Sequence, residues 1–370
     1  MTNNSMSIHL PSEVVTEILL RLPVKSLLRY KCVCKSWLSL ISDPHFATSH
    51  FQLAASPTHR LVSIGNLTLS VDINASLNDD SSYASLSLDF LYGSKVGGSC
   101  RGFLFLHKYM DFYLWNPSTG AHKQIPASPE TIAWPQSNSM LMYGFGYEPS
   151  RDDYFVVLWS TEYPDSDSEP VSTFIVLEVF SLRANKWKKI GGDSFLPYIS
   201  SGDDYESEAL LLNGTLHGPV YDELNSKDVI SAFDLKEMTI SEIALPDDFS
   251  RFERPREYDL LIFHGLLGAW ILDDQMDRIE IWVMQEYAVQ SSWTKTLVFS
   301  LHSSPYFSPL CFTNCGHIVG IDSRGSELVK FNDKGQLIEQ QSLSNRFFRR
   351  SEMAVYSESL LSLPNGTEQA

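Results

Sequence analysis

The residues that most often form metal or nucleophilic sites are few in this chain. Cys32 and Cys34 are separated by a single residue, which is too close for the usual pair of zinc ligands. Cys311, Cys315 and His317 are better spaced, but the sequence offers them no convincing fourth ligand. Neither a Gly-x-Ser-x-Gly nucleophile elbow nor a Gly-x4-Gly-Lys-Ser/Thr phosphate loop occurs. The sequence therefore indicates no catalytic site of these classes, no metal and no cofactor.

Two clusters of carboxylates are the remaining candidates for chemistry. They read DSDSE at 165–169 and DDYE at 203–206, and they suggest either a calcium site or the paired acids of a glycosidase. Both clusters lie in stretches rich in Ser, Gly and Pro, and catalytic carboxylates need rigid, partly buried surroundings that adjust their pKa. We therefore expect both clusters to be solvated loops.

The elements that would position any site differ between the first fifty residues and the rest. Near the N-terminus apolar residues recur at helical spacing, as Val14 and Ile18 do. The pattern predicts helices over 11–21 and 24–30, and a third around Trp37 that ends at Asp43-Pro44. Three helices of this size cannot bury all their apolar side chains against each other. Their remaining apolar surface meets either a partner or the rest of the chain.

Charge is distributed unevenly along the 370 residues. The formal net charge is −17, yet residues 1–50 carry +2, so the remainder carries −19. Such an acidic domain repels a phosphate backbone and attracts basic proteins. No secretory signal and no run of about 18 apolar residues is present, so we expect no membrane segment. Five cysteines, an odd number, favour a reducing compartment, and we expect a soluble intracellular protein, cytoplasmic and/or nuclear.

Beyond Asp43-Pro44 the apolar pattern changes to the period of two that is typical of strands. The clearest predicted strands are 67–73, 103–106, 112–115, 154–159, 174–180, 229–235, 279–284 and 328–331. Several end in an aromatic residue followed by a turn and a return strand, at Trp115, Phe180, Phe233, Trp282 and Phe331. The spacing of these aromatics drifts around fifty residues, which is typical of four-stranded propeller blades of the kelch size class.

The predicted fold is a small three-helix module followed by a mainly-β domain, a β-propeller of about six blades. A β-sandwich is the alternative, because the double glycine of kelch repeats does not recur in register. A propeller would close by pairing the strand after Thr58 with the one near 353–363, which removes free edges. The predicted boundaries are 8–47 for the helical module, 48–57 for a linker, 58–363 for the β domain and 364–370 for a flexible tail.

The helical module resembles the F-box over its whole length of about forty residues. The matching residues are Leu10-Pro11, Glu13, Ile18-Leu19, Leu22-Pro23, Val24, Ser26-Leu27, Cys32-Val33-Cys34-Lys35 and Trp37. The resemblance implies binding to the Skp-type adaptor of a cullin–RING ubiquitin ligase. It implies an adaptor-binding surface made of Leu10, Pro11, Val14, Ile18, Leu19, Leu22, Pro23, Val24, Leu27, Leu28, Val33, Lys35 and Trp37.

The β domain is similar to the F-box-associated domain of plants. The similarity rests on four motifs: SCRG at 99–102, LWNPSTG at 114–120, YGFGY at 143–147 and YSESL at 356–360. An F-box followed by this domain also describes the S-locus F-box group. The resemblance implies a non-catalytic receptor that recruits a target protein to an SCF-type (Skp–cullin–F-box) ligase. The cysteine and histidine array of a RING domain is absent from the sequence, so partners would transfer the ubiquitin.

Two other functions fit the same residues. One is a propeller enzyme with a helical cap, which would need polar residues converging on a central pocket. The other is an F-box protein that holds its adaptor without ubiquitinating a target. The acidic balance of the β domain favours a basic target and disfavours nucleic acid.

Overall fold

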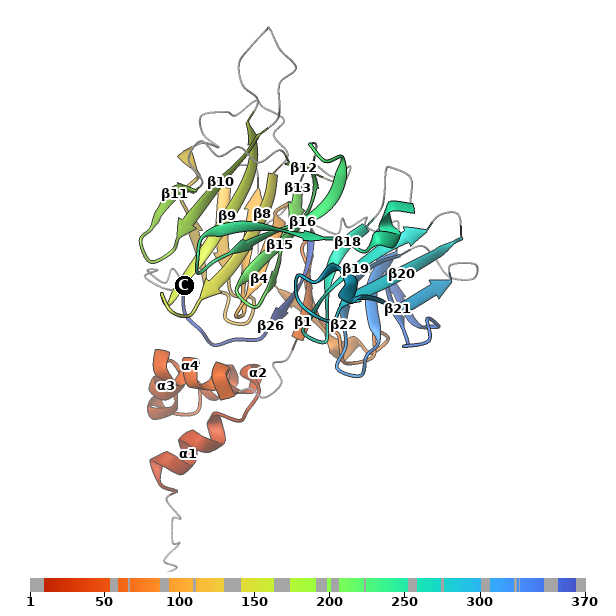
Figure 1. Ribbon diagram of the computed structural model, residues 1–370. Helices are drawn as coiled ribbons and strands as arrows, with labels where there is room; N and C mark the ends of the chain where they lie inside the picture. Colours follow the sequence, from red (N-terminus) through yellow and green to blue (C-terminus); the bar gives the residue numbers. More distant parts are fainter. Residues whose placement is uncertain are drawn as a thin grey trace, which may run out of the picture.

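A computed structural model describes residues 10–363 (Figure 1). The residues left out within this span are 54–58, 66, 87–92, 109–110, 130–140, 163–173, 191–197, 201–205, 223, 252–257, 274–275, 301–306, 323–324, 326 and 343–351. The predicted tail, part of the predicted linker and nearly all of both carboxylate clusters therefore lie outside the described residues. Figure 1 shows a group of short helices below a larger assembly of sheets.

The N-terminal module contains four helices, one more than expected. They are α1 (Ser12–Leu19), α2 (Val24–Tyr30), α3 (Lys35–Ile41) and α4 (Pro44–Leu53). Pro11 and Pro23 stand directly before α1 and α2, as expected of residues that lack an N–H.

The fourth helix corrects the prediction that Asp43-Pro44 ends helical structure and that 48–57 is a linker. The Asp43 carboxylate accepts hydrogen bonds from the backbone N–H groups of His45 (2.7 Å) and Phe46 (3.1 Å). Asp43 thus caps a new helix whose first residue is proline, a favourable first position. The ring of His50 lies 2.8 Å from the Leu22 carbonyl oxygen and holds α4 against the end of α1.

The strands form six sheets, which we call blades 1 to 6. Blade 1 has β26 (Met353–Ser357), β1 (His59–Ser63), β2 (Thr68–Asp72) and β3 (Tyr83–Leu86); blade 2 has β4 (Lys95–Cys100), β5 (Phe103–Lys108), β6 (Asp111–Trp115) and β7 (His122–Ile125). Blade 3 has β8 (Leu141–Glu148), β9 (Asp153–Glu162), β10 (Phe174–Ser181) and β11 (Lys186–Ile190). Blade 4 has β12 (Tyr198–Ser200), β14 (Leu210–Leu212), β15 (Thr215–Asp222), β16 (Lys227–Asp234) and β17 (Thr239–Ala244). Blade 5 has β18 (Tyr258–Phe263), β19 (Leu266–Asp273), β20 (Arg278–Met284) and β21 (Trp293–Ser300); blade 6 has β22 (Phe307–Phe312), β23 (Ile318–Asp322), β24 (Glu327–Phe331) and β25 (Leu337–Ser342).

The predicted six-bladed propeller is confirmed. Every aromatic residue used to find the repeat lies on the third strand of its blade, on β6, β10, β16, β20 or β24. Trp115, Phe180, Phe233 and Phe331 are almost completely buried, and Trp282 nearly so. These side chains are core residues.

The ring closes as predicted, through the last strand of the chain. β26 is antiparallel to β1, with pairs running from His59↔Ser357 to Ser63↔Met353. The loop between β2 and β3 also binds blade 1 to blade 6. The Lys330 ammonium of blade 6 donates to the Ala75 carbonyl in this loop at 2.7 Å. The Leu77 N–H donates to the Glu339 carboxylate at 2.6 Å. The last described strand thus completes blade 1, and these side chains join blade 1 to blade 6.

Blade 4 is irregular and fills the space beside blades 2 and 3. Its inner edge is divided between β12 and β14, which pair with opposite ends of β15. Between them, β13 (Glu206–Glu208) leaves the blade and pairs in parallel with β8 of blade 3. Both β13 and β14 also contact β4 of blade 2. Short strands of the fourth blade therefore occupy part of the ring's inner side.

Candidate functional site

The predicted adaptor-binding surface includes an apolar stripe along the first helix. Val14 and Ile18 lie four residues apart on α1 and are 42% and 48% exposed, and Leu10, just before the helix, is 54% exposed. Most large apolar side chains of a soluble protein are buried, and contiguous exposed ones mark sites of interaction. A helix with apolar residues at this spacing is the form that fits an apolar groove of a partner. The stripe is a candidate docking surface.

The turn between α2 and α3 adds a second exposed apolar region. Val33 is 60% exposed, and Trp37 is half-buried with its ring 5.6 Å from that of Tyr30 in an edge-on contact. Lys35 is exposed beside them. Aromatic residues with an apolar face and little rotational freedom are common anchors in protein interfaces.

The thirteen predicted residues fall into three groups by burial. Leu10, Pro11, Val14, Ile18, Pro23, Val33 and Lys35 are exposed; Leu22, Leu28 and Trp37 are half-buried; Leu19, Val24 and Leu27 are buried. The three buried residues belong to the core of the module, so any effect they have on a partner acts through the shape of the helices. Their direct contact with an adaptor stays a prediction.

Two exposed apolar residues near Trp37 were not among those predicted. Tyr30 is 37% exposed and Leu38 is 47% exposed, next to Trp37 in space or in sequence. Leu38 directly follows Trp37, so it lies outside the stripe that Trp37 and Ile41 form on α3. Helical periodicity alone would have placed Leu38 on the exposed face of this helix. Both extend the candidate surface around Val33.

The opposite side of the helical module is packed against the propeller. One hydrophobic cluster contains Leu27, Ile41 and Phe46 from the helices, Phe103 from blade 2, and Leu360, which follows the last strand. The segment 358–363, which we call the C-terminal strap, belongs to this junction (Figure 1). The expectation that an apolar face of the helices is used internally therefore describes one face of the module, and a partner surface on the other face stays a prediction.

The four motifs of the β domain meet at this junction. The amide of Asn116, in LWNPSTG, donates to the carbonyls of Ser359 and Leu361, each at 3.1 Å. The Ser118 hydroxyl accepts the Ser359 N–H at 3.1 Å. The Arg101 guanidinium, in SCRG, lies 3.9 Å from the ring centre of Tyr147, in YGFGY. These motifs hold the strap and form the seat of the helical module.

Charges also reach across the junction. Burial raises the pKa of the Glu358 carboxyl, while the positive charge of Arg60 and, less strongly, that of Lys25 on α2 lowers it. Arg60 also donates to the Ser70 hydroxyl at 2.6 Å, and Ser70 in turn bonds the Tyr356 hydroxyl at 2.8 Å. The strap therefore begins in a polar network that includes blade 1 and faces α2.

Substitution of Asn116 by alanine should loosen the strap. The side chain is fully buried, so its loss leaves the Ser359 and Leu361 carbonyls without their donor and should cost about 2 kcal/mol or more of unfolding free energy. Asn332 takes the corresponding place after the third strand of blade 6, where its amide bonds only the local turn. Urea denaturation of both alanine variants measures the difference, and equal losses would contradict a role of Asn116 in holding the strap.

Alanine at Gly102 should be destabilising for a different reason. A Cβ atom there would lie 2.2 Å from the Ser359 Cβ, in a backbone with φ of +84°. Strain and overpacking together should cost roughly 2–4 kcal/mol. Gly120 has a φ of +79° and open space around its missing Cβ, so Gly120→Ala is a matched control that carries strain alone. Thermal unfolding of the two variants should separate the two costs, and equal melting temperatures would refute close packing of the strap.

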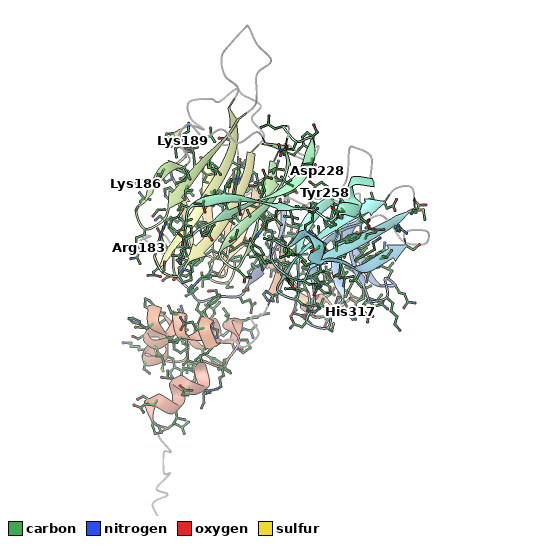
Figure 2. The ribbon with its side chains drawn as sticks, viewed as in Figure 1. Arg183, Lys186, Lys189, Asp228, Tyr258 and His317 are labelled. Carbon is green, nitrogen blue, oxygen red and sulfur yellow. The ribbon has the colours of Figure 1, made fainter. Side chains whose placement is uncertain are left out.

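Among the described residues, those with potential chemistry are not brought together into one site. Cys315 and His317 are 3.3 Å apart in the turn after β22, in blade 6 (Figure 2), and burial raises the pKa of Cys311 to about 12. Burial lowers the pKa of His107 to about 3 and that of His217 to about 4, so both rings are neutral core groups. Within the described part of the chain no group of three His, Cys, Asp or Glu residues could hold a metal ion. None of the described helices is long and apolar enough to cross a membrane.

Comparison with known families agrees with the two-part architecture. Residues 8–48 match the F-box domain, and residues 67–326 match the F-box associated beta propeller domain. An F-box/kelch-repeat protein of Arabidopsis thaliana is 30% identical over 309 residues, which cover 78% of this chain and 79% of that relative. The F-box protein CPR1 of Arabidopsis thaliana is 29% identical over 342 residues, which cover 87% of this chain and 82% of that relative. These names do not distinguish the S-locus group, which stays a prediction.

Proposed function

Because this chain belongs to the family of F-box proteins that carry an F-box associated β-propeller domain, we propose that it is the substrate receptor of an SCF-type ubiquitin ligase. In this role the F-box binds a Skp-type adaptor and, through it, the cullin–RING catalytic assembly. The propeller recruits the target protein. The receptor contributes position: it raises the effective concentration of target lysines near the ubiquitin carrier without itself making bonds.

The observation that carries this proposal is the two-sided helical module. One apolar face is satisfied by the propeller, through Leu27, Ile41 and Phe46. The other, with Leu10, Val14 and Ile18, is exposed although it has the spacing of a docking helix. A module that served only as a cap would need just the first face.

The propeller offers a second surface, at the strand ends that point away from the helices. Leu67, Leu224 and Met276 lie in the loops that join the second and third strands of blades 1, 4 and 5, and all three are exposed. The turns that face the helices, such as the one at Arg101, join the first and second strands. We propose that the target binds at the far ends, and the charge of −19 beyond residue 50 favours a basic target.

Positive charge is not absent from the propeller. Arg183, Lys186 and Lys189 lie along the outer edge of blade 3 (Figure 2), where Lys186 and Lys189 are part of the edge strand β11. Lysines on an edge strand prevent pairing with the strands of other molecules. This local basic edge is therefore consistent with protection against aggregation. It does not change the expectation that the target is basic.

Reconstitution tests the proposed function. The full chain, a plant Skp-type adaptor, cullin, RING protein, ubiquitin and the activating and conjugating enzymes would be combined with proteins that co-purify with the chain. Ubiquitin on a co-purified protein, dependent on both the chain and the cullin, supports the receptor. Adaptor binding without ubiquitination of any co-purified protein would favour a protein that holds its adaptor, and no adaptor binding would overturn the proposal.

A further inference from the structure

Arg101 occupies an unusual position between the two parts of the molecule. It lies in the turn from β4 to β5 with a left-handed backbone, φ of +51°, which residues other than glycine seldom adopt. Its guanidinium carbon lies 3.9 Å from the ring centre of Tyr147 in blade 3 and 5.2 Å from that of Phe51 in α4. One cation thus contacts an aromatic ring from the propeller and another from the helical module.

Arg101 is half-buried, and part of its guanidinium is shielded from water. Its Nε is buried without a hydrogen-bond partner, although its side chain also bonds that of Tyr154. Burying a guanidinium with an unsatisfied donor is unfavourable, whereas cation–π attraction is strongest where water is excluded. Gly102 next to it is pressed against Ser359 of the strap, so the turn itself has little freedom to move. A half-buried cation in a strained turn, with its Nε left without a partner, has a role that folding of the turn alone does not explain.

We propose that Arg101 is the positioning residue that fixes the orientation of the F-box relative to the propeller, by joining Phe51 to Tyr147. The apolar cluster at the junction supplies attraction, but apolar contact has no preferred direction. A guanidinium placed between two aromatic rings does have a preferred direction, because it must face both rings. The biological purpose of this role rests on the proposed function. In a receptor, the orientation of the F-box relative to the propeller sets where a bound target lies relative to the catalytic assembly.

The test measures orientation directly in the full chain, without the ligase. Spin labels would be attached at the exposed native Cys315 in blade 6 and at Ser39→Cys in α3, with Cys32→Ser and Cys34→Ser removing the other exposed thiols. Electron–electron distance measurements should give one narrow distribution. Arg101→Gln and Phe51→Leu should each broaden or shift that distribution while the melting temperature of the propeller stays close to that of the parent.

Two further variants make the comparison specific. Arg151→Gln removes a guanidinium that lies 5.9 Å from the Phe155 ring, a contact between two residues of the propeller, and should leave the distribution narrow. Arg101→Lys keeps a cation at the rings and should restore part of the narrow distribution. An unchanged distribution in both Arg101→Gln and Phe51→Leu, or an equal change in Arg151→Gln, would overturn the inference.

Adaptor affinity of the same variants separates this inference from the proposed function. Arg101→Gln should bind a purified Skp-type adaptor as tightly as the parent, because Arg101 lies at the face of the module opposite to the exposed stripe. If the parent binds no adaptor, the proposed function fails while the distance measurements still decide the role of Arg101. If the adaptor binds and the distances do not respond, the positioning role fails and the receptor stands.

Discussion

Val14→Glu combined with Ile18→Glu abolishes binding of the full chain to a Skp-type adaptor and leaves the chain folded. Both side chains are close to half exposed on α1, so their replacement removes little contact within the protein. In a complex, two carboxylates would be buried against an apolar surface without partners, at a cost of several kcal/mol. Each 1.4 kcal/mol is a factor of about ten in affinity, so we expect a loss of at least about 100-fold. Calorimetric titration measures it.

The control for this variant places one glutamate on a more exposed apolar residue elsewhere. Leu224 lies in a loop of blade 4, on the far side of the propeller from the helices, and is 76% exposed. Leu224→Glu should leave adaptor affinity unchanged. Parent-like affinity of the Val14 and Ile18 double variant, with an unchanged melting temperature, would show that the adaptor does not use this stripe.

Deletion of residues 353–370 should prevent cooperative folding. The deletion removes β26, with all its pairs to β1, and the strap that packs against the helices. It also removes five buried apolar side chains, Met353, Ala354, Tyr356, Leu360 and Leu361. At about 1.5–3 kcal/mol for each of the larger ones, the loss is comparable with the whole stability of a typical domain, about 5–15 kcal/mol.

A shorter deletion provides the comparison for this result. Removal of 364–370 alone leaves β26 and the strap in place and should give the melting temperature of the parent. Differential scanning calorimetry of the two truncated chains distinguishes them. A sharp transition near the parent temperature in the chain that ends at 352 would mean that the ring closes without its last strand.

The propeller could be predicted because blades 2, 3, 4 and 6 repeat one local pattern. A buried third strand ends in an aromatic residue, and the turn that follows contains Asn, Asp or Gly, as at Trp115-Asn116 and Phe331-Asn332. The division of the blade 4 edge into β12 and β14 left no such signal, because strands of three residues are too short to show a period. The parallel pairing of β13 with β8 depends on the geometry of the ring.

The candidate site was predicted less completely than the fold. Helical periodicity marks Val14, Val15, Ile18 and Leu19 as one broad apolar face, but Leu19 is buried while Val14 and Ile18 are exposed. Periodicity alone cannot divide such a face between a partner and the rest of the chain. The fourth helix was missed because Asp-Pro was interpreted as a stop, although the same pair makes a favourable helix start.

The motifs show a related limit. SCRG and LWNPSTG were recognised as marks of a domain family, and neither spacing nor composition connects them to the helices. Their contacts join residues far apart in sequence, such as Arg101 with Phe51 and Asn116 with Leu361. Only the closed ring brings these residues together.

The position of the strap has a consequence for the order of synthesis. The F-box helices leave the ribosome first, but Leu360 and Leu361, which complete their seat, are made about 310 residues later. At roughly 5–20 residues per second, the helices wait on the order of 15–60 s with both apolar faces uncovered. A chain interrupted before its last strand thus carries an F-box without a fixed orientation. Seating of the first fifty residues therefore indicates that synthesis has passed the strap.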